Sequence, residues 1–194
     1  MPDQLALFEE RPLKPEGLDY TAAVITAGEE ASLIERIAAL PLKPFQFGQF
    51  EGKRRVVWFG YSYDYQQQRL VESEPIPGWL QPFIARVEES AGPGTRIEQI
   101  LCTEYDAGVG IGWHRDKPHF DRIFGLSLGS ACKFRFRRLN DKTSAKPWAR
   151  FTLDAAPRSL YAMTGEAREV WEHSIPGVEQ RRYSITFRTM RRRS

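Results

Sequence analysis

The sequence predicts an α+β domain whose antiparallel strands form a barrel or a two-sheet jelly roll, with helices covering one face. Two early segments carry apolar residues at helical spacing, and after Pro93 the chain changes to short β-type runs broken by Gly and Pro. With 194 residues and 41% hydrophobic content, the chain can bury one sizeable core but is short for two. We therefore expect a single domain over residues 21–190, followed by a basic tail at 191–194.

The first elements follow from local patterns. Residues 1–20 lack apolar periodicity and contain three prolines, which predicts an extended, peripheral arm. From Glu29 to Leu40 the apolar residues recur at helical spacing up to Pro41, so this segment is predicted to be an amphipathic helix packed on something larger. A second helix is expected around residues 78–90.

The remaining elements are predicted to be strands. Six β-type runs are separated by turn residues, at 96–105, 122–128, 132–138, 149–153, 158–163 and 182–188. The last run alternates strictly, with Tyr183, Ile185 and Phe187 on one face and polar residues on the other. Taken alone, it reads as an edge strand that shows its polar face to water.

Cysteine usage and hydropathy bear on the compartment. Cys102 and Cys132 both fall in predicted strands and are expected to be core residues. The chain has no apolar N-terminal segment and no apolar stretch of about 18 residues, which argues against secretion and against membrane insertion. We expect a cytoplasmic protein that is monomeric.

Charge is unevenly distributed, although the formal net charge is only +3. Eight acids and two bases occupy residues 1–35, whereas the segment 133–150 opposes seven bases to Asp141 alone. Arg191, Arg192 and Arg193 form the tail, for which simple solvation is an adequate explanation. The basic segments make a polyanionic partner plausible.

Two of the three histidines stand in informative places. His114 and Asp116 follow a Gly-rich turn, and in an extended segment residues i and i+2 point to the same side. His173 comes 57 residues after Asp116. Two imidazoles and one carboxylate form the facial triad that suits Fe(II) and leaves coordination positions free. A surface ion pair or a turn is the alternative explanation of His114 and Asp116.

The strand that begins at Arg182 sharpens this signal. Arg182 follows His173 by nine residues, a distance that lets a hairpin return it beside the metal. A guanidinium inside a barrel needs a carboxylate partner, and the distal carboxylate of 2-oxoglutarate offers a bidentate one.

Residues 45–66 combine aromatic residues with a basic cluster ahead of the barrel. Trp58 and Tyr61 can provide stacking faces, while Arg54 and Arg55, with Lys53, can hold phosphate, as a lid over an unstacked nucleotide requires. A β-hairpin with aromatic core residues explains the same pattern. His119 is expected on the surface, and Trp113 and Trp171 are expected to pack around the metal.

The order and spacing of Tyr105, the His114-Arg115-Asp116 motif, His173 and the segment 182–188 resemble the AlkB family of 2-oxoglutarate- and Fe(II)-dependent nucleic-acid dioxygenases. The resemblance implies a double-stranded β-helix, or jelly roll, with the N-terminal helices packed on one sheet. It implies Fe(II) held by His114, Asp116 and His173, 2-oxoglutarate held by Arg182 with Tyr105 and Arg188 assisting, and O2 as the second cosubstrate.

Two positions depart from the family pattern. Thr103 replaces a common Asn, and Pro118 replaces the carboxylate that helps some bacterial members to read the base. The segments 54–61 and 163–166 look most like the branch that hydroxylates a wobble uridine in tRNA. The implied activity is oxidative demethylation of alkylated bases or hydroxylation of a modified tRNA base, with single-stranded DNA or RNA as the partner. A nucleic-acid-binding module without turnover and a hydroxylase of proteins or small molecules are the alternatives.

Overall fold

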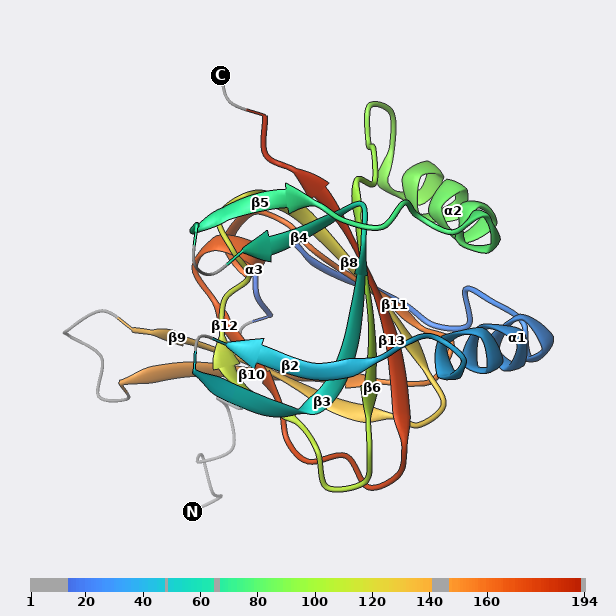
Figure 1. Cartoon of the computed structure of the whole chain (residues 1–194). Helices are drawn as coiled ribbons and strands as arrows, with labels where there is room; N and C mark the ends of the chain where they lie inside the picture. Colours follow the sequence, from blue (N-terminus) through green and yellow to red (C-terminus); the bar gives the residue numbers. More distant parts are fainter. Residues whose placement is uncertain (1–13, 48, 65–66, 141–146, 193–194) are drawn as a thin grey trace, which may run out of the picture.

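Eight consecutive strands are divided equally between two sheets that face each other (Figure 1). The computed structural model describes residues 14–47, 49–64, 67–140 and 147–192. The eight strands are β6 (Gln99–Tyr105), β7 (Ile111–His114), β8 (Phe120–Leu128), β9 (Cys132–Leu139), β10 (Trp148–Ala155), β11 (Leu160–Met163), β12 (Glu172–Ile175) and β13 (Arg182–Met190). The larger sheet contains β11-β8-β13-β6 and the smaller one β10-β9-β12-β7. This order is a jelly roll, so the predicted fold class is confirmed.

Further strands extend the larger sheet at both edges. β1 (Leu18–Thr21) pairs with β11, while β3 (Phe50–Phe59) pairs with β6 and carries β2 (Lys43–Phe47) beyond it. A separate hairpin follows, formed by β4 (Tyr61–Asp64) and β5 (Arg69–Glu72). The backbone of the described residues in 45–66 therefore forms β-hairpins, as the alternative explanation of this segment predicted. Tyr65 and Gln66, at the end of that segment, lie outside the described residues.

The two longer helices lie together on one side of the larger sheet (Figure 1). α1 (Ala27–Ala38) begins with a capping box, in which the Thr26 Oγ1 accepts from the Glu29 amide and the Glu29 carboxylate accepts from the Thr26 amide. The 3-10 turn η1 (Gly78–Leu80) leads into α2 (Gln81–Ala91), and a short α3 (Gly165–Glu169) precedes β12. The helices predicted from periodicity at 29–40 and 78–90 are confirmed.

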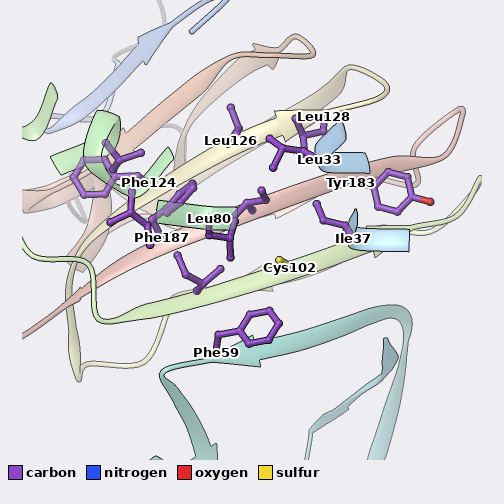
Figure 2. Packing of buried hydrophobic residues seen from close by; sticks show 14 of the residues in the cluster. Leu33, Ile37, Phe59, Leu80, Cys102, Phe124, Leu126, Leu128, Tyr183 and Phe187 are labelled. Atoms are coloured by element: carbon purple, nitrogen blue, oxygen red, sulfur yellow. The ribbon is translucent and has the colours of Figure 1, made fainter. Parts of the chain in front are cut away.

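One apolar core fills the space between the helices and the sheet. Leu33 and Ile37 from α1 and Leu80 from η1 lie above side chains of β6, β8 and β13, such as Cys102, Leu128 and Phe187 (Figure 2). Leu33, Ile37 and Leu80 are each at most 1% exposed. Truncating a Leu buried to this degree costs about 2 to 5 kcal/mol, so the amphipathic spacing of α1 explains why the helix docks here.

A second core lies between the two sheets. It is rich in aromatic rings, including Phe134, Phe136, Tyr161 and Trp171. Gly125 on β8 pairs with Tyr161 on β11, and a Cβ at Gly125 would lie 2.1 Å from the Tyr161 ring. Glycine therefore makes room for this ring. Cys102 and Cys132 are buried and unbonded, as expected for core residues.

Strand β13 differs from its simplest sequence interpretation. It runs between β8 and β6 rather than at an edge, and every residue from Arg182 to Thr189 is buried. The helices cover the apolar face of β13 and the smaller sheet covers its polar face. The alternating pattern therefore divides side chains between two buried layers and does not mark a solvent-exposed face.

The N-terminal arm also needs a correction. Within the expected arm at 1–20, residues 1–13 lie outside the described part, but Leu18 begins β1 and is 2% exposed. A single apolar residue is too little for a periodicity signal, yet it suffices to anchor an edge strand. In the basic tail, the described residues Arg191 and Arg192 lie near Glu169 and Glu98 respectively. Among the described residues, no helix is long and apolar enough to span a membrane.

Candidate metal and cosubstrate site

The structure brings His114, Asp116 and His173 together at one end of the space between the sheets. His114 ends β7 and His173 lies directly opposite it on the neighbouring strand β12. The candidate ligand atoms of the three side chains all lie within 4.8 Å of one another. Cross-strand pairing of two short strands thus brings together histidines that are 59 positions apart in the sequence.

Hydrogen bonds and burial prepare these side chains for a cation. The His114 Nδ1 lies 2.8 Å from the Gly112 carbonyl oxygen, so a proton on Nδ1 donates there and Nε2 is left as the ligand atom. Burial and the neighbouring His173 lower the pKa of His114 to about 4. Burial alone would raise the pKa of Asp116, but Arg188 and His173 outweigh it and hold that pKa well below its usual range. Neutral imidazoles and an ionised carboxylate are the states that bind a metal ion.

A cleft of about 640 Å³ opens from this centre. Its walls include Tyr105 and Arg188 from the larger sheet and Trp58 from β3. Thr103, where the family commonly has Asn, also lines the cleft and is 2% exposed. The volume falls in the range typical of small-molecule sites, so a cosubstrate and part of a substrate can share it.

Arg182 is the most deeply buried arginine among the described residues. It is 1% exposed, and its Nη2 donates to Ser127 Oγ at 3.0 Å while its guanidinium lies 5.2 Å from the centre of the Tyr105 ring. Its Nε and Nη1 have no hydrogen-bond partner among the described residues, where no carboxylate lies within ion-pair distance of it either. A buried guanidinium with two unsatisfied donors is costly unless an anion completes it. The carboxylate of 2-oxoglutarate fits that need.

Arg188 makes a further contact, with a candidate metal ligand. Its Nη2 donates to Asp116 Oδ1 at 2.7 Å and its Nη1 to Gln99 Oε1 at 2.8 Å. It lines the cleft and holds a candidate metal ligand by a hydrogen bond, so it orients Asp116 in addition to any contact with a cosubstrate.

The substrate-binding candidates divide into two groups. Arg54 and Trp58 line the cleft, with the Arg54 guanidinium 3.8 Å from the centre of the Phe45 ring. Arg55 does not reach the cleft, because it points to the opposite face of β3 and forms an ion pair with Glu104 at 2.6 Å. This corrects the grouping of Arg55 with Arg54, since neighbouring residues of a strand point to opposite faces.

Tyr61 is a second correction. It is not among the cleft-lining residues, and its carbonyl oxygen accepts from Gln99 Nε2. Gly60 has φ of +80° and turns the chain out of β3 into β4, where Tyr63, two residues beyond Tyr61, lines the cleft. A glycine between two aromatic residues was the signal for this break.

Other residues near the motif occupy supporting positions. Lys117 and His119 lie near the Tyr63 ring, at 4.3 Å and 5.8 Å. Trp171 is fully buried in the second core, as the packing role predicted for it requires. Trp113 lines the cleft.

Comparisons with known proteins agree with this geometry. Residues 22–188 match the family model described as the 2OG-Fe(II) oxygenase superfamily. The chain is 31% identical over 152 residues to the alkylated DNA repair protein ALKBH8 homolog of Arabidopsis thaliana, covering 64% of this chain and 42% of that protein. It is 32% identical over 168 residues to the tRNA (carboxymethyluridine(34)-5-O)-methyltransferase ALKBH8 of Mus musculus, covering 83% of this chain and 24% of that protein.

Solved structures share the fold. The structure of OsALKBH1 superposes with a TM-score of 0.67 at 14% identity, covering 92% of this chain and all of that one. A Pseudomonas putida prolyl-4-hydroxylase superposes with a TM-score of 0.63 at 13% identity, covering 90% of this chain and 93% of that one. The chain spans less than half the length of the two relatives compared by sequence. It belongs to the 2OG-Fe(II) oxygenase superfamily and, within it, to the AlkB family, which implies Fe(II), 2-oxoglutarate and O2 as its cofactor and cosubstrates.

Proposed function

We propose that this chain is a nucleic-acid dioxygenase that removes methyl groups from alkylated bases or hydroxylates a modified base of tRNA. His114, Asp116 and His173 would hold Fe(II), and Arg182 would hold the distal carboxylate of 2-oxoglutarate beside Tyr105. When bound, the iron supplies oxidation of a substrate C–H bond by O2, coupled to decarboxylation of 2-oxoglutarate to succinate and CO2. The side chains position the reactants and exclude water.

The observation that carries the proposal is the charge of the cleft wall. Its lining side chains include five cationic ones, Lys53, Arg54, Arg115, Lys117 and Arg188, and the only acid among the lining residues is the metal ligand Asp116. Charges of one sign around a cleft focus the electrostatic field and attract an oppositely charged ligand. A nucleotide with its flanking phosphates matches this wall better than a neutral peptide does.

Aromatic rings line the same cleft. Phe45 and Trp58 lie with ring centres 6.0 Å apart, and Tyr63 and Trp113 contribute further faces. Stacking on an aromatic ring is a sequence-tolerant way to hold an unstacked base. This combination of rings and cations supports the lid interpretation of the 45–66 segment, now assigned to β2, β3 and β4.

We favour a nucleotide in a single strand or in an RNA loop over a paired base. Extruding a paired base costs a few kcal/mol, while one aromatic platform returns about 1 to 3 kcal/mol. Similarity to a mouse tRNA-modifying protein favours RNA, whereas the plant relative is named as a DNA repair protein. The free thiols Cys102 and Cys132 fit a reducing compartment such as the cytoplasm.

The test is turnover of defined polymers. The full chain is incubated with Fe(II), 2-oxoglutarate, ascorbate and either a methylated single strand, the same strand in a duplex, or tRNA, and the nucleosides are analysed by mass spectrometry. Succinate formation without substrate shows in parallel whether the centre is competent. Succinate formation with no change in any nucleoside would contradict the nucleic-acid proposal, and absence of succinate would favour a binding module without turnover.

A further inference from the structure

Four cations of the basic segment 133–150, Lys133, Arg135, Arg137 and Arg150, do not line the cleft and lie on the outer face of the smaller sheet. On β9, Phe134 and Phe136 point inward to the second core, so Lys133, Arg135 and Arg137 point outward. On β10, Arg150 pairs in register with Arg137 and is exposed. Register partners in an antiparallel sheet lie on the same face, so these cations share one surface.

Two indole rings enclose one of these cations. The Arg137 guanidinium lies 4.4 Å from the centre of the Trp113 ring and 4.4 Å from that of the Trp148 ring, and its Nε donates to Glu172 Oε2 at 2.7 Å. Arg135 lies 5.2 Å from the Trp113 ring. Stacking between cations and rings attracts them to each other, so these contacts orient Trp113, Arg137 and Trp148 on the surface.

The charge of this face is only partly neutralised. Glu172 pairs with Arg137, and Asp154 pairs with Lys133. Arg135 donates only to Ser174 Oγ, and neither Arg135 nor Arg150 has a carboxylate within ion-pair distance in the described part of the chain. Like charges in register across strands, such as Arg150 and Arg137, are destabilising. A bound polyanion would relieve that repulsion.

Trp113 connects the outer face to the cleft. It precedes the metal ligand His114 on β7, which is the edge strand of the smaller sheet. Its ring contacts the outer-face arginines, and it is also one of the residues that line the cleft. A strand whose target nucleotide enters the cleft can therefore continue over Trp113 without leaving a basic and aromatic surface.

We propose that Trp113, Arg135, Arg137, Trp148 and Arg150, here called the outer basic face, bind the single-stranded nucleic acid that flanks the target nucleotide. The inference rests on the proposed function, because it needs a polymeric nucleic-acid substrate. The arginines contact phosphates, and the partly exposed indole rings stack with bases. An acidic polypeptide could satisfy the cations but would make no use of the two indole faces, so nucleic acid is the favoured occupant.

The test measures binding rather than turnover. Anisotropy of labelled RNA and DNA single strands of about 4 and about 12 nucleotides is measured on the full chain with Fe(II) and 2-oxoglutarate, without oxygen, over a range of salt. The variant Arg135→Gln/Arg150→Gln is compared with Arg36→Gln/Arg96→Gln, which removes the same charge from the helix side of the molecule. Circular dichroism melting checks that each variant is folded.

We expect the parent to bind the long strands more tightly than the short ones. In Arg135→Gln/Arg150→Gln the affinity for the long strands should fall about tenfold, and the slope of log K against log salt should decrease by about 1.4, since each phosphate contact on a single strand contributes about 0.7. Affinity for the short strands should stay within about twofold. Trp148→Ala should weaken long-strand binding by roughly 5- to 100-fold. Comparing the RNA titrations with the DNA titrations shows which of the two polymers binds to this face.

The outcomes separate this inference from the proposed function. A parent chain that binds neither strand length would contradict the nucleic-acid substrate itself. Parent-like long-strand binding by Arg135→Gln/Arg150→Gln, or an equal loss in Arg36→Gln/Arg96→Gln, would overturn the outer basic face alone. Equal competition by polyglutamate, or no effect of Trp148→Ala, would overturn the assignment to nucleic acid.

Discussion

Arg188 and Asp116 form a buried ion pair, in which Arg188 Nη2 lies 2.7 Å from Asp116 Oδ1. The other carboxylate oxygen, Oδ2, lies 3.3 Å from His173 Nε2. Arg188, which is always charged, thus holds Oδ1 of the Asp116 carboxylate, while Oδ2 faces His173, another candidate metal ligand. Residues that hold a metal ligand in this way typically contribute 10- to 100-fold to metal affinity.

Arg188→Gln should therefore weaken metal binding by about 10- to 100-fold while leaving the 2-oxoglutarate requirement nearly unchanged at saturating metal. Titration with Fe(II) or Co(II), followed by steady-state measurement of the KM for 2-oxoglutarate, checks both. A raised KM with parent-like metal affinity would instead assign Arg188 to the cosubstrate, as the family resemblance implies.

Replacing any one metal ligand should abolish turnover. His114→Ala, Asp116→Ala and His173→Ala each remove one of three protein bonds to the metal, so bound iron and succinate formation should both fall to near background. Metal analysis and a succinate assay measure this, and circular dichroism shows whether the fold survives. The triad assignment is wrong if any of the three variants turns over like the parent.

Arg182→Lys should raise the KM for 2-oxoglutarate strongly, because an ammonium group cannot reproduce a planar two-bond clamp on a carboxylate. Metal binding should persist, since the side chain of Arg182 contacts Ser127 and Tyr105 and neither belongs to the triad. Ser127→Ala is a matched control that removes the hydrogen bond between the Arg182 guanidinium and Ser127 Oγ, and it should have a smaller effect. Equal KM values in Arg182→Lys and the parent would place the anchor elsewhere.

The fold was predictable where periodicity was strong and local. The helix at 29–40 could be recognised because its apolar residues repeat at helical spacing, and the six strand runs because β-type residues stand between turn residues. β7 and β12, which carry His114 and His173, have four residues each and no clear alternation. Their pairing is a long-range property, so only the ligand chemistry of the histidines pointed to them.

The site was predictable by residue type more than by orientation. Arg54 and Arg55 are adjacent cations in the run Lys53-Arg54-Arg55, which has no alternation of its own, and only the register of β3 on β6 shows which one faces the cleft. Likewise, the sequence of β13 predicted a strand with one face in water, because a sequence cannot show that two different layers will cover its two faces.

Acidic pH should weaken the contact between helices α1 and α2. The Glu29 carboxylate accepts from Arg86 on α2 and from the Thr26 amide, and mainly the Arg86 hydrogen bond lowers its pKa from 4.5 to about 2. A carboxyl whose folded pKa is depressed stabilises the fold above its unfolded pKa and loses that contribution as pH falls through the folded value. The loss should therefore run from about pH 4.5 to about pH 2.

Urea unfolding of the parent and of Glu29→Gln at several pH values tests this. Glutamine keeps the capping pattern but not the charge, so the variant should be less stable than the parent at neutral pH and the difference should vanish towards pH 2. A difference that stays constant across this range would show that Glu29 acts only through the helix cap.

The adjacent arginines of β3 offer the sharpest test of substrate binding. Arg54 is 8% exposed, lies against the Phe45 ring and lines the cleft, whereas Arg55 faces away and pairs with Glu104. Arg54→Gln and Arg55→Gln each remove one positive charge from neighbouring positions, so they change the overall charge of the protein equally.

If the cleft holds a nucleotide through phosphate contacts, Arg54→Gln should lower the slope of log K against log salt by about 0.7 for a single strand. Arg55→Gln should leave both slope and affinity close to the parent values. Anisotropy titrations of one labelled single strand at several salt concentrations measure both variants side by side, and an equal loss in the two would mean that the polymer senses the charge of β3 in general and not the cleft.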